Sequence, residues 1–309
     1  MKKVLTSLVL AGSALLGFSQ QDAQFSQNMF NRLAINPGYA GSNNAICTNL
    51  LGRQQWVSFP GAPKTFLLSI DAPIKMIHGG AGLTIAQDQL GFEKTLIANI
   101  TYAYRRPLGP GEIGIGLNGG IINKSLNGDW VAIDPYETDP SIPDNGVSDL
   151  VFDLGFGVYY NISEELYVGI STAHLPASTI TATELNFDLA RHHYIMAGYN
   201  YPLPSNPMLE LKPSLFVKTD AASTQLDINC NLMYNKMFWG GVSYRVSDAM
   251  AIMLGFQHSS GVKVGYAYDL TTSSIKSHSS GSHEIMLGYC FKLPEKKSKL
   301  QKHKNVRFL

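Results

Sequence analysis

The segment 224–234, TQLDINCNLMY, alternates strictly between apolar and polar side chains, and this alternation limits the fold more than any other feature of the sequence. Every second position belongs to one set, Leu226, Ile228, Cys230, Leu232 and Tyr234, and Gln225, Asp227, Asn229, Asn231 and Met233 lie between them. A side-chain period of two indicates an extended strand with two unlike faces. One face of this strand is therefore mostly apolar, and the other carries a carboxylate and three amides.

The same alternation recurs along the chain, while helical periodicity is almost absent after residue 45. Turn signals divide this part into strands near 45–59, 65–73, 79–88, 93–106, 111–123, 148–160, 165–174, 188–201, 207–218, 224–235, 237–246, 249–257, 261–271 and 282–293. Transmembrane strands need about 9–11 residues, and bacterial single-chain barrels have an even strand number. We therefore predict an all-β fold, a transmembrane antiparallel β-barrel of fourteen strands with an N-terminal plug-like segment and long extracellular loops.

The connection lengths agree with a barrel, because such barrels have short turns at one end and long loops at the other. The longest connections, Lys124–Val147, Leu175–Phe187 and Thr272–Gly281, follow the fifth, seventh and thirteenth predicted strands. All three numbers are odd, so all three loops lie at one end of the barrel. Both chain termini then lie at the short-turn end, on the periplasmic side.

A soluble β-sandwich is the alternative, since alternation arises there in the same way. Its strands are typically about 5–6 residues long, whereas most of the predicted strands reach ten. Charged residues make up 15% of the chain, against about 25% in a typical soluble domain. The net charge of +1 gives no indication of a nucleic-acid partner. The apolar strand faces are thus expected to contact lipid and the polar faces a lumen.

The first residues have the pattern of a Sec signal peptide. Lys2 and Lys3 precede an apolar run from Val4 to Leu16, and small residues follow, so we place cleavage after Ser19. A short membrane anchor is the alternative, but spanning a bilayer takes about 20 apolar residues. We expect residues 1–19 to direct export and the mature chain to be integral to the outer membrane.

Two segments fall outside the predicted barrel, which spans 45–293. Residues 20–44 are polar, aromatic and rich in turn residues, and would form a plug in the lumen or lie in the periplasm. Residues 294–309 form a strongly basic tail on the periplasmic side. Such a charge run is usually a solvated tail, but here it offers possible contacts to a periplasmic partner. The tail residues predicted to contact such a partner are Lys296, Lys297, Arg307 and Phe308.

The long loop within 124–149 is acidic, aromatic and proline-rich, which makes it the best candidate for contact with an exported protein. The partner-binding residues predicted there are Asp129, Trp130, Asp134, Tyr136, Asp139 and Asp144. Two alternatives remain open, a solvated loop with acidic turn residues and a Ca²⁺ site, because hard cations bind several oxygen ligands. The spacing matches no EF-hand, and we expect no other cofactor.

The three cysteines leave at least one without an internal partner. Barrel closure makes the first and last strands neighbours, and Cys47 and Cys290 then both lie near the periplasmic rim on the lumen side. A disulfide across this seam is a hypothesis. Cys230 lies on the apolar face and is expected to act as a small apolar residue.

No catalytic motif is evident, and we expect no enzyme activity. His192 and His193 are adjacent, so in a strand they face opposite sides and cannot bind one metal. The other histidines, such as His174, are scattered along the sequence. Ser277 and His278 are neighbours in a loop, which is a weak signal because a nucleophile also needs a base oriented by a third group.

Several stretches are similar to one known family. These are QDAQFSQNMFNRLAINPGYAGS at 21–42, RQQWVSFPGAPKTFLLSIDAP at 53–73, GSHEIMLGYCF at 281–291 and NVRFL at 305–309. On these motifs the chain resembles the PorP/SprF family of Bacteroidetes outer-membrane proteins. The resemblance covers nearly the whole mature chain.

The resemblance implies a fourteen-stranded barrel in the type IX secretion and gliding motility machinery, without enzyme activity. It implies partners among type IX periplasmic or outer-membrane subunits, and a secreted adhesin with a C-terminal sorting domain that the barrel holds on the cell surface. The alternative function is an outer-membrane channel for small or hydrophobic solutes. Glycines predicted to face the lumen leave room for either a channel or a plug, so they do not decide: Gly114, Gly116, Gly155, Gly157, Gly265 and Gly288.

Overall fold

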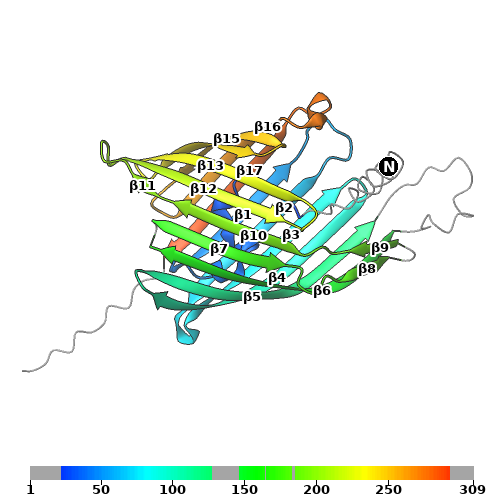
Figure 1. Cartoon of the computed structure of the whole chain (residues 1–309), viewed down its shortest axis with the longest axis horizontal. Coiled ribbons are helices and arrows are strands. Elements are labelled where there is room, and N and C mark those ends of the chain that lie inside the picture. Colours follow the sequence, from blue (N-terminus) through cyan, green and yellow to red (C-terminus); the bar gives the residue numbers. More distant parts are fainter. Residues whose placement is uncertain (1–21, 127–145, 164, 183–184, 293–309) are drawn as a thin grey trace, which may run out of the picture.

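The protein, described by a computed structural model, is a closed β-barrel of tilted antiparallel strands (Figure 1). The structure describes residues 22–126, 146–163, 165–182 and 185–292. Fourteen strands form the wall: β1 Ala45–Gln54, β2 Lys64–Ile74, β3 Gly79–Leu90, β4 Glu93–Leu108, β5 Gly111–Leu126, β6 Val147–Ile162, β7 Leu166–Ala173, β10 His192–Tyr199, β12 Leu209–Thr219, β13 Thr224–Tyr234, β14 Phe238–Arg245, β15 Ala249–Gln257, β16 Val262–Thr271 and β17 Ser282–Lys292. Among the described helices, none is long and apolar enough to cross a membrane.

The remaining elements are short. A hairpin of β8 (Thr179–Ala182) and β9 (Leu185–Asp188) forms a separate two-stranded sheet, and β11 (Tyr201–Pro202) pairs with the start of β12. The described helical turns are η1 Asn28–Phe30, α2 Arg32–Ile35, η2 Pro37–Tyr39, η3 Lys75–Ile77 and η5 Ser274–Ser277. Three of these turns precede the first strand, so the chain enters the barrel wall only at Ala45.

Each wall strand pairs antiparallel with its neighbours in the chain, and β1 pairs with β17 to close the cylinder. The β1–β17 register places Cys47 opposite Cys290 and Arg53 opposite Glu284. The β10–β12 pairing joins the other two ends of the strand order. No strand edge of the wall is left open by this order, which is how barrels avoid edge-to-edge association.

The faces of β13 are as the alternation predicts. Asp227, Asn229 and Asn231 are 2%, 1% and 3% exposed, whereas Ile228 and Leu232 on the opposite face are 50% and 42% exposed. Large apolar side chains are exposed over the whole outer surface of the wall, which is unfavourable in water but favourable in lipid. The fold prediction of a fourteen-stranded transmembrane barrel is confirmed.

The loops sort to the two ends as the sequence predicts. The connections β5–β6, β7–β10 and β16–β17, which are the longest, lie at one end, here called the long-loop end. The opposite end, here called the terminal end, carries the start of β1 at Ala45 and the end of β17 at Lys292. In Figure 1 the β8–β9 hairpin marks the long-loop end and β11 the terminal end.

Two predicted strands differ from the structure by four or more residues at one end, and one predicted loop overlaps a hairpin. The first strand ends at Gln54 instead of residue 59, because Trp56 and Ser58 have positive φ angles of 47° and 76° that end an extended strand. The predicted strand 188–201 is shorter in the structure, where β10 spans His192–Tyr199. The predicted loop 175–187 overlaps the β8–β9 hairpin, 179–188, which forms a separate sheet outside the wall.

Candidate functional site

Residues 22–44, called the lumen segment below, run inside the barrel from the long-loop end to the terminal end. Asp22 contacts His174, which follows β7 at the long-loop end, and Asn43 contacts Cys47 near the start of β1. The polar side chains at the centre of the segment are almost fully buried: Ser26 0%, Gln27 0%, Asn28 5%, Asn31 2% and Asn36 0% exposed. The wall strands therefore enclose a folded polypeptide where a porin would have water.

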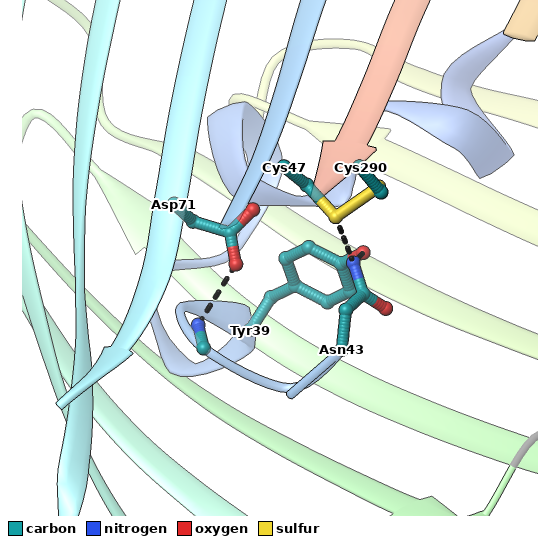
Figure 2. The surroundings of a disulfide bond; sticks show 6 residues. Tyr39, Asn43, Cys47, Asp71 and Cys290 are labelled. Carbon is teal, nitrogen blue, oxygen red and sulfur yellow. Dashed lines mark hydrogen bonds between the residues drawn. A yellow bond between two sulfur atoms is a disulfide. The ribbon is translucent and has the colours of Figure 1, made fainter. Parts of the chain in front are cut away.

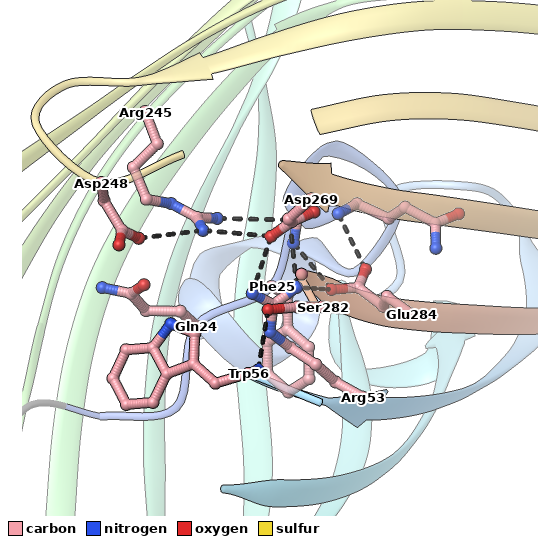
Figure 3. A network of polar contacts seen from close by, with 12 residues as sticks. Gln24, Phe25, Arg53, Trp56, Arg245, Asp248, Asp269, Ser282 and Glu284 are labelled. Atoms are coloured by element: carbon pink, nitrogen blue, oxygen red, sulfur yellow. Dashed lines mark hydrogen bonds and ion pairs between the residues drawn. The ribbon is translucent and has the colours of Figure 1, made fainter. Parts of the chain in front are cut away.

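A buried charged cluster holds the first part of the lumen segment (Figure 3). Arg53 on β1 lies 2.7 Å from Asp269 on β16 and 3.1 Å from Glu284 on β17. The backbone amides of Ser26 and Gln27 donate to the Glu284 carboxylate at 2.7 and 2.9 Å. The Ser26 hydroxyl donates to Asp269 at 2.7 Å. The wall carboxylates thus bind both their neighbouring arginine and the backbone of the lumen segment.

A second arginine closes the cluster from the other side. Arg245, at the end of β14, lies 3.2 Å from Asp227 and 3.4 Å from both Asp248 and Asp269. Figure 3 shows Arg53 and Arg245 approaching Asp269 from two sides. Removing one partner of such a buried pair costs about 3–5 kcal/mol, because the other charge stays buried without compensation. The cluster therefore fixes one arrangement of the lumen segment against the wall.

Glycines on β5 form a close contact with the middle of the segment. A Cβ at Gly116 would lie 2.3 Å from the carbonyl carbon of Pro37, and one at Gly114 would lie 2.2 Å from the carbonyl oxygen of Gly38. Two strands away, a Cβ at Gly80 of β3 would lie 2.3 Å from the carbonyl oxygen of Ala40. Since no side chain fits at these distances, the bare strand backbone is needed to admit the segment. The space left by these glycines is filled by the lumen segment.

Asn36 joins the segment to two wall strands. Its side-chain amide donates to the carbonyl oxygens of Val158 on β6 and Ile170 on β7, at 3.0 and 3.1 Å. The side-chain oxygen Oδ1 of Asn36 accepts the backbone N–H of Gly38 at 2.8 Å, so Asn36 is also the N-cap of η2. A short amide at this position satisfies three backbone groups in a fully buried place.

Arg32 anchors the segment against tyrosines on one side of the lumen. Its guanidinium lies 3.7 Å from the centre of the Tyr167 ring and donates to the Tyr159 hydroxyl at 3.0 Å. A cation over an aromatic face contributes about 0.5–2 kcal/mol, with the larger values for desolvated pairs. Tyr159 also packs edge-on against Tyr39 of the segment, with ring centres 5.3 Å apart.

The barrel seam carries a disulfide (Figure 2). Cys47 of β1 and Cys290 of β17 face each other in the strand pairing and are joined. The side-chain amide of Asn43 contacts the Cys47 sulfur at 3.4 Å and donates to the Tyr39 hydroxyl at 2.7 Å. The cross-link therefore ties the first strand to the last where the lumen segment enters the wall. Cys230 is free and exposed on the outer face.

A histidine pair lies where the segment reaches the long-loop end. Among the described residues, Asp22, His174 and His192 bring one potential ligand atom each to within 4.8 Å of the others. Burial alone lowers the pKa of His174, but Asp22 and Asp153 outweigh it and raise that pKa to about 10. Burial raises the pKa of Asp22, but the two histidines and Tyr194 hold it below its usual range.

The sequence did not predict this cluster. His192 and His193 do face opposite sides, since His192 is buried and His193 exposed. In the sequence His174 is one of several scattered histidines, but the fold places it beside His192 with ring centres 5.8 Å apart. Only the combined path of β7, β10 and the lumen segment reveals the contact, and no local motif signals it.

Two cavities lie at the two ends of the lumen. The one at the long-loop end has a volume of about 580 Å³ and is lined by residues including Asp22, His174 and His192. The one at the terminal end has a volume of about 1060 Å³ and is lined by residues including Asn43 and Lys292. Between them lie the buried residues of the lumen segment.

The partner-binding residues predicted from the sequence lie outside the described residues. This holds for the loop set Asp129, Trp130, Asp134, Tyr136, Asp139 and Asp144, and for the tail set Lys296, Lys297, Arg307 and Phe308. The Ca²⁺ site considered for this loop also lies outside the described residues. At the base of that loop, Lys124 of β5 forms an ion pair with Glu93 of β4 at 2.9 Å.

The closed wall, the apolar outer face and the occupied lumen define an outer-membrane type of β-barrel with an internal plug. The sequence model of the family described as "Type IX secretion system membrane protein PorP/SprF" matches residues 17–289. The chain therefore belongs to the PorP/SprF family, as its motifs predict. It matches no curated protein sequence.

The chain is similar in fold to solved structures that include a toluene transporter and a monoaromatic hydrocarbon channel. The toluene transporter TbuX of Ralstonia pickettii is 10% identical with a TM-score of 0.50, over 85% of this chain and 93% of TbuX. The monoaromatic hydrocarbon channel CymD is 12% identical with a TM-score of 0.49, over 90% and 95% of the two chains. At such low identity the likeness shows the fold and nothing about cargo.

Proposed function

We propose that this barrel serves type IX secretion and gliding by supporting the secretion and cell-surface attachment of a partner protein with a C-terminal sorting domain, without enzyme activity of its own. Membership of the PorP/SprF family supports the assignment to that machinery. The observation that carries the proposal is the occupied lumen. A segment tied to the wall by buried ion pairs suits a rigid holder of a partner better than a path for solutes.

The proposed orientation follows from the loops. The signal peptide at 1–19 directs export, the terminal end faces the periplasm and the long-loop end faces the cell surface. The exported partner then contacts the 127–145 loop and its neighbours at the long-loop end. The basic tail at 294–309 contacts periplasmic type IX subunits through its lysines, arginine and terminal aromatic residue.

The first test is affinity purification from mildly solubilised outer membranes, with an epitope tag inserted in the short turn at 221–222. We expect mass spectrometry to find a large secreted protein with a C-terminal sorting domain, together with type IX periplasmic subunits. Replacing 127–145 by a flexible linker of equal length should remove the secreted protein only. Replacing 294–309 in the same way should remove the periplasmic subunits only, so that each variant is the control for the other.

The alternative function, a channel for small or hydrophobic solutes, makes an opposite prediction in planar bilayers. A barrel whose lumen segment stays in place should give little or no steady conductance. Purification of the barrel without partners, together with stable conducting pores, would favour the channel. The TbuX likeness does not decide this, because it establishes the fold alone.

A further inference from the structure

The histidine pair at the long-loop end has the donors of a metal site and is independent of the proposed function. Asp22 comes from the lumen segment, His174 from the connection after β7, and His192 from the first position of β10. His174 is 5% exposed and His192 2% exposed. Two imidazoles are thus buried around one carboxylate, although their residues are far apart in sequence.

Each imidazole has an outer acceptor that orients the ring. His174 Nδ1 lies 3.1 Å from a carboxylate oxygen of Asp153, and His192 Nδ1 lies 3.0 Å from the backbone oxygen of Ala190. Metal binding requires a proton on each Nδ1 and none on Nε2, and in that state both Nε2 atoms carry a lone pair on the side of Asp22. His174 Nε2 is 3.0 Å from Asp22 Oδ1, and His192 Nε2 accepts the backbone N–H of Asp22 at 3.3 Å, a bond that an ion bound to this nitrogen would replace. Metal-bound histidines usually have this kind of outer partner.

The Asp22 carboxylate has one oxygen committed to the wall and one oxygen facing His174. The Tyr194 hydroxyl donates to Oδ2, which leaves Oδ1 towards His174 Nε2. Lys218 is close, but its amine donates to the backbone oxygen of Asp22 at 2.8 Å. The carboxylates of Asp22 and Asp153 bring two negative charges to this buried place.

Two imidazole nitrogens and one carboxylate oxygen are the donors preferred by borderline divalent cations such as Zn²⁺. His174 has a positive φ of 55°, an uncommon backbone conformation outside glycine, and such outliers concentrate at binding sites. The cavity at the long-loop end is lined by all three residues, so an ion can reach them. The fourth position of a tetrahedral ion would then be open to water or to a ligand in that cavity.

We propose that Asp22, His174 and His192 bind one Zn²⁺-like divalent cation, with Asp153 as the outer partner of His174. The ion lies between His174 Nε2 and Asp22 Oδ1, which are 3.0 Å apart. Binding joins the start of the lumen segment to two wall elements. The ion would therefore hold the start of the lumen segment in place at the long-loop end.

The test uses the full mature chain in detergent after treatment with a chelator. Titration with Zn²⁺ against a metallochromic indicator should give one site per chain, and elemental analysis after desalting should give the same ratio. His174→Ala and His192→Ala should each weaken binding by at least about 100-fold, and Asp153→Asn by about 10–100-fold. Cobalt(II) should give the visible absorption of a four-coordinate site with nitrogen and oxygen ligands.

His193→Ala is the matched control, because His193 is adjacent to His192 but exposed, and its ring contacts Thr172. It should bind Zn²⁺ like the wild type. Asp22→Ala adds a variant that leaves every wall strand unchanged and should also lose the site. A wild-type barrel without stoichiometric Zn²⁺, or equal binding by His193→Ala, His174→Ala and His192→Ala, would overturn the proposal and leave an ion pair between His174 and Asp22.

Discussion

Arg53 and Asp269 lie 2.7 Å apart, although their strands β1 and β16 are separated by β17. The ion pair therefore reaches across a strand, and it does so on the inner face, where Glu284 of β17 also binds Arg53. The lumen segment is built onto this pair, because Ser26 contributes both its hydroxyl and its backbone amide to the same carboxylates. The wall and the plug thus share one polar core.

Removal of the Arg53 charge should destabilise the barrel strongly. Arg53→Met leaves Asp269 and Glu284 buried with fewer compensating charges. We therefore expect the free energy of unfolding in denaturant to fall by about 3–5 kcal/mol. Tryptophan fluorescence of the detergent-solubilised protein would measure this. Arg106→Met is the control, because Arg106 is exposed on the outer face of β4 and should change the free energy little. Equal losses in both variants would contradict a special role for the cluster.

The Arg32 anchor should depend on the shape of the guanidinium as well as on its charge. Arg32→Leu loses the contact with the Tyr167 ring and the bond to Tyr159, and should lower the free energy of unfolding by about 1–3 kcal/mol. Arg32→Lys keeps the charge but not the planar stack, so it should recover only part of that loss. Full recovery by lysine would mean that charge alone matters at this position.

The seam disulfide should be present in protein isolated without reductant. Alkylation after unfolding in non-reducing conditions should modify one cysteine, Cys230, and prior reduction should expose Cys47 and Cys290 as well. Cys47→Ser with Cys290→Ser should lower stability by about 2–5 kcal/mol, since the bond closes a long loop in the unfolded chain. Cys230→Ser is the control and should leave stability nearly unchanged. Three alkylated cysteines without reductant would show that the bond does not form.

Much of the wall could be predicted from the sequence because its signal is local. Alternation in 224–234 assigns each side chain to lipid or lumen without knowledge of the neighbouring strands. The three long connections all follow odd-numbered strands, which places them at the same end of the barrel. The end of the first strand could not be predicted, because the strand ends where Trp56 and Ser58 adopt positive backbone φ angles. Neither residue type indicates such a conformation.

The lumen contacts could not be predicted because they join distant parts of the chain. His174 and His192 meet Asp22 only after the barrel has closed and the segment has taken its path inside. Similarly, the sequence left the role of Gly116 open between a channel and a plug. The structure resolves it, since Pro37 occupies the space that a side chain would need. Periodicity shows whether a residue faces lipid or the lumen, but not what occupies the lumen next to that residue.

Gly116 provides the most direct test of the plug. Gly116→Val would place its Cβ 2.3 Å from the Pro37 carbonyl carbon, so the segment must leave the wall around Pro37 and Gly38. We expect this variant to show larger and more frequent conductance steps in planar bilayers than the wild type, because displacement of the segment opens a path between the two cavities. The reason is steric, so the outward strand face should remain in contact with lipid as before.

Gly119→Val is the matched control on the same strand. Its Cβ would face outwards and meet only the Leu154 side chain, at 3.4 Å. We expect wild-type conductance from this variant, with the same heat-modifiable mobility of a folded barrel in gels. If Gly116→Val is folded by that criterion and remains as silent as Gly119→Val, the segment does not seal the lumen at Pro37. The closed barrel would then owe its low conductance to the charged cluster around Arg53 and Ser26.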